Sequence, residues 1–166
     1  MIVCGIDPGK TGALVALRPD GTSALLRMPI KEDGKSIDGK AVALWLTLES
    51  VDVVCIELIG ARGHRNAAGK AIRNAGNEFR FAIGVGVLHG VLDAMAIPYK
   101  TVSPMRWKVA ILKGTGTDKA AAVSYVQRFL PQVDLTPGRM TKPNDGIADA
   151  ACMAVYGRDA IKWNKA

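Results

Sequence analysis

The sequence predicts an α/β protein with a mixed five-stranded sheet and helices on both faces of that sheet. Three short apolar runs come first and are typical of strands, and a turn motif joins the second run to the third. Helical patterns then alternate with two further strand-like runs, which favours parallel strands covered by helices. The length of 166 residues suits one domain, so residues 1–166 are expected to fold as a single unit.

The first three strands follow from short apolar runs and the turns between them. Residues 2–7 (IVCGID) end in an acid and are followed by Pro8-Gly9, which predicts a buried strand and then a turn. Residues 13–18 and 22–28 are separated by Pro19-Asp20-Gly21. These turn residues predict a hairpin of two antiparallel strands.

The next two elements are predicted to be an amphipathic helix and a central strand. From Ser36 to about Ser50, large apolar residues recur at helical spacing: Ile37, Ala41, Leu44, Trp45 and Leu48. Residues 51–58 (VDVVCIEL) are rich in β-branched residues and almost entirely apolar. Such a run is typical of a strand that is buried on both faces.

A long apolar stretch, residues 79–96, is too long for a strand and predicts a buried helix. Its glycines, Gly84, Gly86 and Gly90, lack the spacing and context of a nucleotide-binding motif, so they are expected to allow close packing on the sheet or on a second subunit.

Residues 99–102 predict a short strand, and three helices are expected after it. The first begins at Ser103-Pro104, the second is capped by Thr117 and ends at Phe129, and the last runs from Asn144 through Tyr156. A polar loop is expected over 131–143.

The chain is basic, with a net charge of +7, which makes a polyanionic partner a reasonable expectation. The cations gather in two segments that also contain glycines and small residues, as expected for close approach to a phosphate backbone. A solvated charged surface would give the same composition. The candidate DNA-binding residues are Arg62, Arg65, Lys70, Arg73, Arg80, Arg106, Lys108, Lys113 and Lys119.

The expected location is the cytoplasm. No apolar run approaches the roughly 18 to 20 residues of a membrane span, and the N-terminus lacks the pattern of a signal peptide. Cys4, Cys55 and Cys152 are scattered within apolar runs, so they are expected to be small buried residues and neither disulfides nor zinc ligands.

Two acids are candidate site residues because they end apolar strands. Asp7 ends the first strand, and Glu57 lies near the end of the predicted central strand. A carboxylate in an apolar strand is costly unless it is paired or bound to a metal. Either acid alone could instead be a structural partner of an arginine.

Two further acids, Asp145 and Asp149, lie at the start of the last predicted helix. Residues four apart share one helical face, so both carboxylates can point the same way. Asp145 could equally serve the helix N-terminus. Asp149 is a stronger candidate, because the run around it is mostly apolar and should face the sheet.

A cluster of these acids would repel itself unless cations neutralised it. Hard oxygen ligands favour Mg²⁺ or Mn²⁺. Two such ions roughly 4 Å apart can clamp a phosphodiester for hydrolysis. No serine, cysteine or histidine in the chain lies in a recognisable nucleophile setting.

An ordered set of motifs resembles the RuvC-like Holliday junction resolvases of the RNase H-like superfamily, in particular the shorter phage-type members. The motifs span nearly the whole chain: GIDPG with Asp7, IEL with Glu57, Trp107-Lys108, GTGTDK at 114–119, and DGIADA with Asp145 and Asp149.

This resemblance implies an RNase H-like fold and a crossover junction endodeoxyribonuclease of DNA recombination, repair or phage DNA processing. It further implies a homodimer that binds four-way DNA junctions and makes paired nicks that leave 5′-phosphates, with two Mg²⁺ per active site that Mn²⁺ can replace. Asp7, Glu57 and Asp149 match the carboxylates of the family, and Asp145 is expected as the fourth ligand. Lys119 matches a lysine near the scissile phosphate, and Lys108 matches a DNA contact. A phage-encoded protein would act in the cytoplasm of its bacterial host.

Two other functions remain open. An RNase H-like nuclease could use the same acids on flaps, RNA–DNA hybrids or structured RNA. A branched-DNA-binding module without catalysis could use them only for structure. A sugar-kinase-like or actin-like ATPase would need two domains, for which this chain is too short.

Overall fold

A computed structural model describes residues 1–58, 64–65, 71–72, 75–114, 116 and 119–163 of the chain. Its centre is a five-stranded sheet in the order β3-β2-β1-β4-β7. The strands are β1 (Val3–Ile6), β2 (Ala13–Leu17), β3 (Ser23–Arg27), β4 (Val53–Glu57) and β7 (Tyr99–Val102). β2 is antiparallel to β1 and β3, whereas β1, β4 and β7 run parallel. The predicted mixed five-stranded sheet is therefore confirmed.

The predicted hairpin between β2 and β3 forms around the turn that its sequence indicates. Gly21 has a φ of +85°, a conformation that glycine adopts without steric cost. The backbone N–H of Thr22 donates to Oδ1 of Asp20 at 2.9 Å. Local turn chemistry therefore sets the register of this antiparallel pair.

Five helices accompany the sheet in the described part of the chain: α1 (Gly39–Leu48), α2 (Ala75–Ala94), α3 (Pro104–Ile111), α4 (Lys119–Phe129) and α5 (Asp145–Asp159). α1 begins later than predicted, because Asp38 is its N-cap and accepts from the backbone N–H groups of Lys40 and Ala41. α3 follows Ser103-Pro104, as the sequence predicts. None of the described helices is both long enough and apolar enough to cross a membrane.

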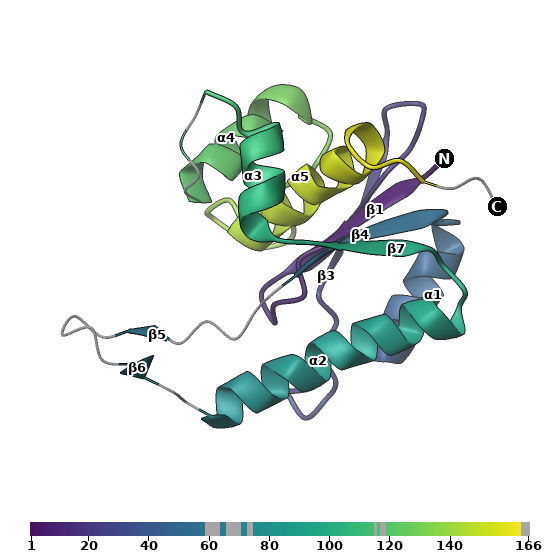
Figure 1. Ribbon diagram of the computed structural model, residues 1–166, viewed down its shortest axis with the longest axis vertical. Coiled ribbons are helices and arrows are strands. Elements are labelled where there is room, and N and C mark those ends of the chain that lie inside the picture. Colours follow the sequence, from purple (N-terminus) through teal and green to yellow (C-terminus); the bar gives the residue numbers. More distant parts are fainter. Residues whose placement is uncertain (59–63, 66–70, 73–74, 115, 117–118, 164–166) are drawn as a thin grey trace.

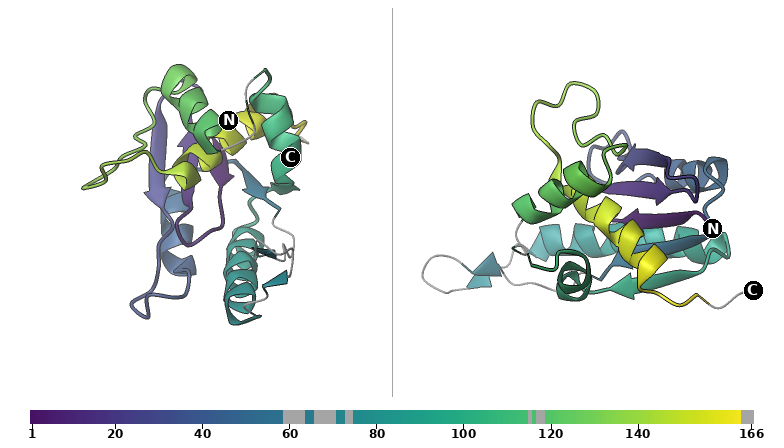
Figure 2. Two further views of the ribbon diagram at one scale, coloured as in Figure 1. Left: turned by 90° about the vertical axis from the view of Figure 1, so that its left-hand side faces the viewer. Right: turned by 90° about the horizontal axis from the view of Figure 1, so that it is seen from above.

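The helices cover both faces of the sheet, as predicted, with α1 and α2 on one side and α3, α4 and α5 on the other (Figures 1 and 2). Alternate strand residues face the two layers. Cys4 and Ile6 of β1 pack with the α1–α2 side, whereas Cys55 of β4 packs with α5. All three cysteines are buried and free, which confirms their predicted place in the core.

α5 lies directly on β1 because a glycine leaves room for it. A Cβ atom added to Gly5 would lie 2.0 Å from the carbonyl oxygen of Ala150 and 2.5 Å from the backbone nitrogen of Ala154. Backbone atoms cannot move aside as a flexible side chain can. Gly5 therefore sets the distance between β1, which Asp7 directly follows, and α5, which carries Asp145 and Asp149.

Two predictions about the middle of the chain need correction. A two-stranded hairpin, β5 (His64–Arg65) with β6 (Ala71–Ile72), lies in the basic segment, where the sequence indicated no strands. The prediction that the long apolar helix is buried is wrong for one side of α2: Leu88 and Leu92 are buried, but Phe79 and Ile83 are exposed. Helix α2 is apolar nearly all round, so its sequence alone does not indicate which side faces the core.

Candidate active site

The site begins where two neighbouring parallel strands end. β1 and β4 pair in parallel with Ile6 opposite Ile56, so Asp7 and Glu57, the next residue of each chain segment, come together at the carboxyl edge of the sheet. Open α/β sheets commonly place their ligand sites at this edge. Glu57 is only 9% exposed, the one charged residue among the buried residues that the structure describes.

The Asp7 carboxylate is held among glycines. Its Oδ1 accepts from the backbone N–H of Gly9 at 3.0 Å. A Cβ atom added to Gly12 would lie 2.9 Å from Cγ of Asp7, and one added to Gly146 would lie 2.9 Å from its Oδ2. The absence of side chains at these positions lets the start of α5 approach Asp7 directly.

Helix α5 brings Asp145 and Asp149 to the same edge. Asn144 caps this helix, as predicted, and its Oδ1 accepts from the backbone N–H of Ile147 at 2.9 Å. Asp145 and Asp149 follow on the first turns and are both partly buried. Their spacing of four residues places them on one side of the helix.

Electrostatic interactions link Asp149 to the other three acids. Burial raises the pKa of the Asp149 carboxyl to about 7 from its usual 3.8, the positive charge of Lys108 opposes this shift, and the negative charges of Glu57, Asp7 and Asp145 add to it. Oδ1 of Asp149 is buried and has no hydrogen-bond partner among the described residues. The ionised form of Asp149 therefore needs a positive partner that the described side chains do not fully supply.

A tryptophan completes the buried part of the site. The Nε1–H of Trp107, on α3, donates to Oε1 of Glu57 at 3.0 Å, and Trp107 is fully buried. Nζ of Lys108 lies 5.3 Å from the centre of the same indole ring, within the range of a cation–π contact. The sequence motif pointed to Lys108 but gave Trp107 no role. The available signal was that a buried indole N–H requires an acceptor.

The four acids fit a divalent cation by their chemistry. All offer hard carboxylate oxygens, and Oδ1 of Asp149 lacks a partner among the described residues. Within the described ranges, however, no three acidic, histidine or cysteine side chains already lie close enough together to hold a metal ion. Binding would therefore require some of these carboxylates to rotate toward a common point.

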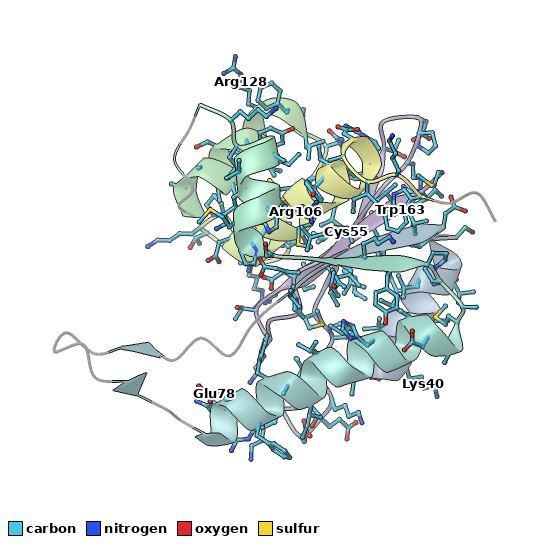
Figure 3. The ribbon with its side chains drawn as sticks, in the orientation of Figure 1. Lys40, Cys55, Glu78, Arg106, Arg128 and Trp163 are labelled. Carbon is cyan, nitrogen blue, oxygen red and sulfur yellow. The ribbon has the colours of Figure 1, made fainter. Side chains whose placement is uncertain are left out.

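The predicted DNA-binding cations have varied positions. Arg106 lies on α3, on the same side of the sheet as α5 (Figure 3), and Lys113 is exposed just after that helix. Arg80 is exposed on α2. Arg65 lies in β5 and Lys119 begins α4, but their side chains are outside the described part. Arg62, Lys70 and Arg73 lie outside the described residues altogether.

The remaining reactive residues lie away from the acids or in the core. The ring of His89 on α2 contacts the ring of Tyr99 on β7, with 5.2 Å between the ring centres. Burial raises the pKa of the Cys55 and Cys152 thiols to about 12. A thiol with so high a pKa is a poor nucleophile near neutral pH.

The solved structures that have the same fold as this chain include two of RuvC. One is T. thermophilus RuvC in complex with a Holliday junction substrate: the TM-score is 0.62, the identity is 18%, and the match covers 95% of this chain and 93% of that chain. The other is a Thermus thermophilus RuvC structure, with a TM-score of 0.59, 20% identity, and coverage of 95% and 96%. No protein-family model and no curated protein matches the sequence.

The match extends over nearly the full length of both proteins, so the chain has the RNase H-like fold of RuvC. The resemblance that the motifs indicate is thereby confirmed for the fold. At this level of identity, function has to be argued from the site itself.

Proposed function

We propose that this protein is a Holliday junction resolvase, a metal-dependent endodeoxyribonuclease that makes paired nicks in four-way DNA junctions and leaves 5′-phosphates. The observation that carries the proposal is the gathering of Asp7, Glu57, Asp145 and Asp149 at one edge of a RuvC-like fold, with Asp149 electrostatically linked to the other three. Acids that repel one another are tolerated where they serve a cation.

In this proposal Asp7, Glu57 and Asp149 hold Mg²⁺, and Asp145 is the fourth ligand. Two bound ions would supply an activated water and neutralise the leaving oxygen, and Mn²⁺ would replace Mg²⁺. The protein's own part is to keep the carboxylates in place: Gly9 binds the Asp7 carboxylate, and Trp107 binds that of Glu57. Lys108, beside the acids, can attract a DNA phosphate.

The proposed substrate is branched DNA. One of the matching RuvC structures contains a Holliday junction, and this chain is basic, with Arg80, Arg106 and Lys113 exposed. Lys119 begins α4 and is proposed to lie near the scissile phosphate, with Arg62, Arg65, Lys70 and Arg73 as further DNA contacts. The proposed location is the cytoplasm, where such DNA is found in a bacterial cell.

The proposed assembly is a homodimer, since paired nicks require two active sites. The α2 outer face, formed by Phe79, Ile83, Gly86 and Gly90, supports it. Phe79 is 68% and Ile83 is 48% exposed, and a Cβ atom on either glycine would meet nothing within 4 Å. An exposed apolar strip that includes glycines suits close packing against a second copy.

Cleavage of defined DNA substrates tests this function. Wild-type protein with Mg²⁺ is expected to nick a synthetic four-way junction in preference to a flap or an RNA–DNA hybrid. Asp7→Asn and Glu57→Gln should each lower the nicking rate by a factor on the order of 100 or more while junction binding persists. Ca²⁺ should support binding without cleavage, since its looser coordination suits a two-metal site poorly.

The outcomes separate the alternatives. Preference for the hybrid or the flap would replace the resolvase with another RNase H-like nuclease. Junction binding by a protein that nicks none of the three substrates would indicate a binding module. Full cleavage in EDTA would contradict the metal-dependent mechanism.

A further inference from the structure

The hydrogen bond between Trp107 and Glu57 is a structural constraint on the candidate site. It joins a fully buried indole N–H to a carboxylate that is 9% exposed, at 3.0 Å. Leaving either group without a hydrogen-bond partner in the interior would destabilise the folded protein. The bond therefore has few alternatives in the folded protein, and it limits the rotation of the Glu57 side chain.

The position of Trp107 is itself fixed by its surroundings. Pro104 opens α3 three residues earlier, and the indole packs in the same core cluster as Cys55 of β4 and Ile147 of α5. The ring therefore packs against β4 and α5, the elements that contain Glu57, Asp145 and Asp149. Its N–H engages Oε1 of Glu57, which leaves Oε2 as the second acceptor of that carboxylate.

The same indole also contacts the positively charged side chain of Lys108. Nζ of Lys108 lies 5.3 Å from the ring centre, and its charge lowers the pKa of Asp149. Trp107 therefore contacts both Glu57 and Lys108, and Lys108 in turn interacts electrostatically with Asp149. This arrangement goes beyond what a core tryptophan requires for packing alone.

We propose that Trp107 is a positioning residue that holds the Glu57 carboxylate in one orientation, so that its second oxygen serves as a metal ligand. This inference rests on the proposed function, because it assumes that Glu57 binds a divalent cation. Partners that orient a metal ligand through a hydrogen bond commonly change metal affinity about 10- to 100-fold when removed.

The test is metal binding without DNA, measured by calorimetric titration of Mn²⁺. Trp107→Phe keeps an aromatic ring but lacks the N–H, and it is expected to weaken Mn²⁺ binding about 10-fold. In nicking assays at saturating Mg²⁺, kcat should fall while the KM for the junction is unchanged. The matched control is Trp163→Phe, which removes an indole hydrogen bond to the carbonyl oxygen of Gly157 at 2.8 Å.

A second replacement guards against loss of folding in Trp107→Phe. 3-Benzothienylalanine at position 107 keeps the shape of tryptophan and replaces the N–H with sulfur, so it should weaken Mn²⁺ binding to the same extent. Wild-type affinity and kcat in both variants would overturn the positioning role and leave the proposed function intact. A wild-type protein that binds no divalent cation would overturn both.

A groove beside the site supports a second inference, independent of the metal. Its volume is about 330 Å³, and it lies between the turn after β1, the loop before α1 and the first half of α2. We call it the α2 groove; the residues of its lining used here are Pro8, Lys10, Ile30, Lys35, Arg80 and Phe81. Ile83, which belongs to the α2 outer face, also lines it, so the groove borders the proposed dimer interface. Because Pro8 directly follows Asp7, the groove adjoins the candidate site.

The lining of the α2 groove combines positive charge with apolar walls. Lys10, Lys35 and Arg80 are exposed, whereas Ile30 and Phe81 are half-buried, and no acid is among the described residues of the lining. Oδ1 of the nearby acid Asp33 accepts hydrogen bonds from the backbone N–H groups of Lys35 and Ser36. Cations bind phosphates and apolar side chains bind the faces of unpaired bases, which is the combination that single-stranded DNA requires.

The geometry points to the α2 groove as a binding site for an unpaired DNA strand next to the scissile position. The probe is a fluorescently labelled single-stranded oligodeoxynucleotide, and affinity is measured by anisotropy. Lys35→Glu and Phe81→Ala should each weaken binding about 10-fold. The control, Lys40→Glu, changes an exposed lysine of α1 outside the lining and should have a much smaller effect.

Equal losses in Lys35→Glu and Lys40→Glu would show that only overall charge matters and would overturn the groove as a site. Unchanged affinity in Lys35→Glu and Phe81→Ala would do the same. Because the readout is binding of single-stranded DNA, either result leaves junction cleavage by the wild-type protein as a separate question.

Discussion

At the scale of single residues, Asp149 is the most informative acid of the site. It is partly buried, and one of its oxygens has no hydrogen-bond partner among the described residues. The negative charges of three other acids also disfavour its ionised form. A residue kept only for stability would not be expected in such a position. Asp7 differs, because the N–H of Gly9 satisfies one of its oxygens.

This difference leads to a prediction about stability and pH in the absence of metal. The pKa of Asp149 is about 7 in the folded protein and near 3.8 when unperturbed. Between pH 3.8 and pH 7 the Asp149 carboxyl is therefore mostly protonated in the folded state and mostly ionised in the unfolded state. Its contribution to stability is therefore largest below about pH 4, falls as the pH rises toward 7, and is then constant.

Asp149→Asn removes this charge and should unfold at a higher temperature than wild type at pH 8 in EDTA, with no such difference at pH 4. A change of about 1 kcal/mol corresponds to roughly 2–4 °C in a protein of this size. Thermal denaturation at the two pH values measures it. Glu32→Gln, an exposed control, should follow wild type. A variant less stable than wild type at pH 8 would contradict the prediction.

At the scale of elements, the site depends on the contact between α5 and the end of β1. Gly5 and Gly146 remove the side chains that would separate them, and Asn144 starts the helix at the sheet edge. The two strand acids and the two helix acids belong to segments far apart in the sequence. Their proximity is a property of this packing.

Gly146→Ala tests that contact. The added Cβ would lie 2.6 Å from the carbonyl oxygen of Thr11 and 2.9 Å from Oδ2 of Asp7, so the start of α5 must shift. Overpacking of this kind costs about 1–3 kcal/mol, and a lower unfolding temperature and slower junction nicking are both expected. Ala120→Ser adds one atom at an exposed position of α4 and should change neither. Wild-type stability and rate in Gly146→Ala would show that α5 tolerates displacement.

At the scale of the whole molecule, the proposed function requires two surfaces, one for a second copy and one for DNA. Helix α2, which carries the apolar α2 outer face, lies on the side of the sheet away from α5 (Figure 2). The described cations Arg106, Lys108 and Lys113 lie on or just after α3, on the other side. A dimer through α2 would therefore leave the α3 side of each copy accessible, and the cations Lys10, Lys35 and Arg80 of the α2 groove would lie beside the interface.

Ile83→Glu should convert the dimer to a monomer. A charge buried in an apolar interface has no partner and opposes association. Sedimentation velocity measures the change. Val109→Glu is the matched control, because Val109 is equally apolar and 58% exposed but lies on α3. A wild-type protein that sediments as a monomer, or a dimeric Ile83→Glu variant, would exclude this interface.

Junction binding should weaken steeply as salt is raised, because phosphate contacts release counterions. Six neutralised phosphates would give a slope of about −5 in a plot of log affinity against log salt concentration. Anisotropy titrations with a catalytically inactive Asp7→Asn variant measure it without cleavage. A flat dependence would mean that the basic residues do not contact the DNA backbone.

The sequence by itself determined the five strands of the main sheet, the order of the main helices and the choice of the four candidate acids. Short-range signals sufficed there: Asp20-Gly21 for the hairpin, Asn144 for the start of α5, and apolar runs that end in Asp7 and Glu57. These signals are local, so they can be interpreted without knowledge of the rest of the fold.

Only the tertiary structure decided which of these residues meet. The exposed side of α2, the bond from Trp107 to Glu57, and the close approach of Gly146 to Asp7 are contacts between distant segments. α2 is apolar all round, so its burial depends on what packs against it. The physical reason is the same in each case: packing selects one arrangement among several that the local sequence permits equally well.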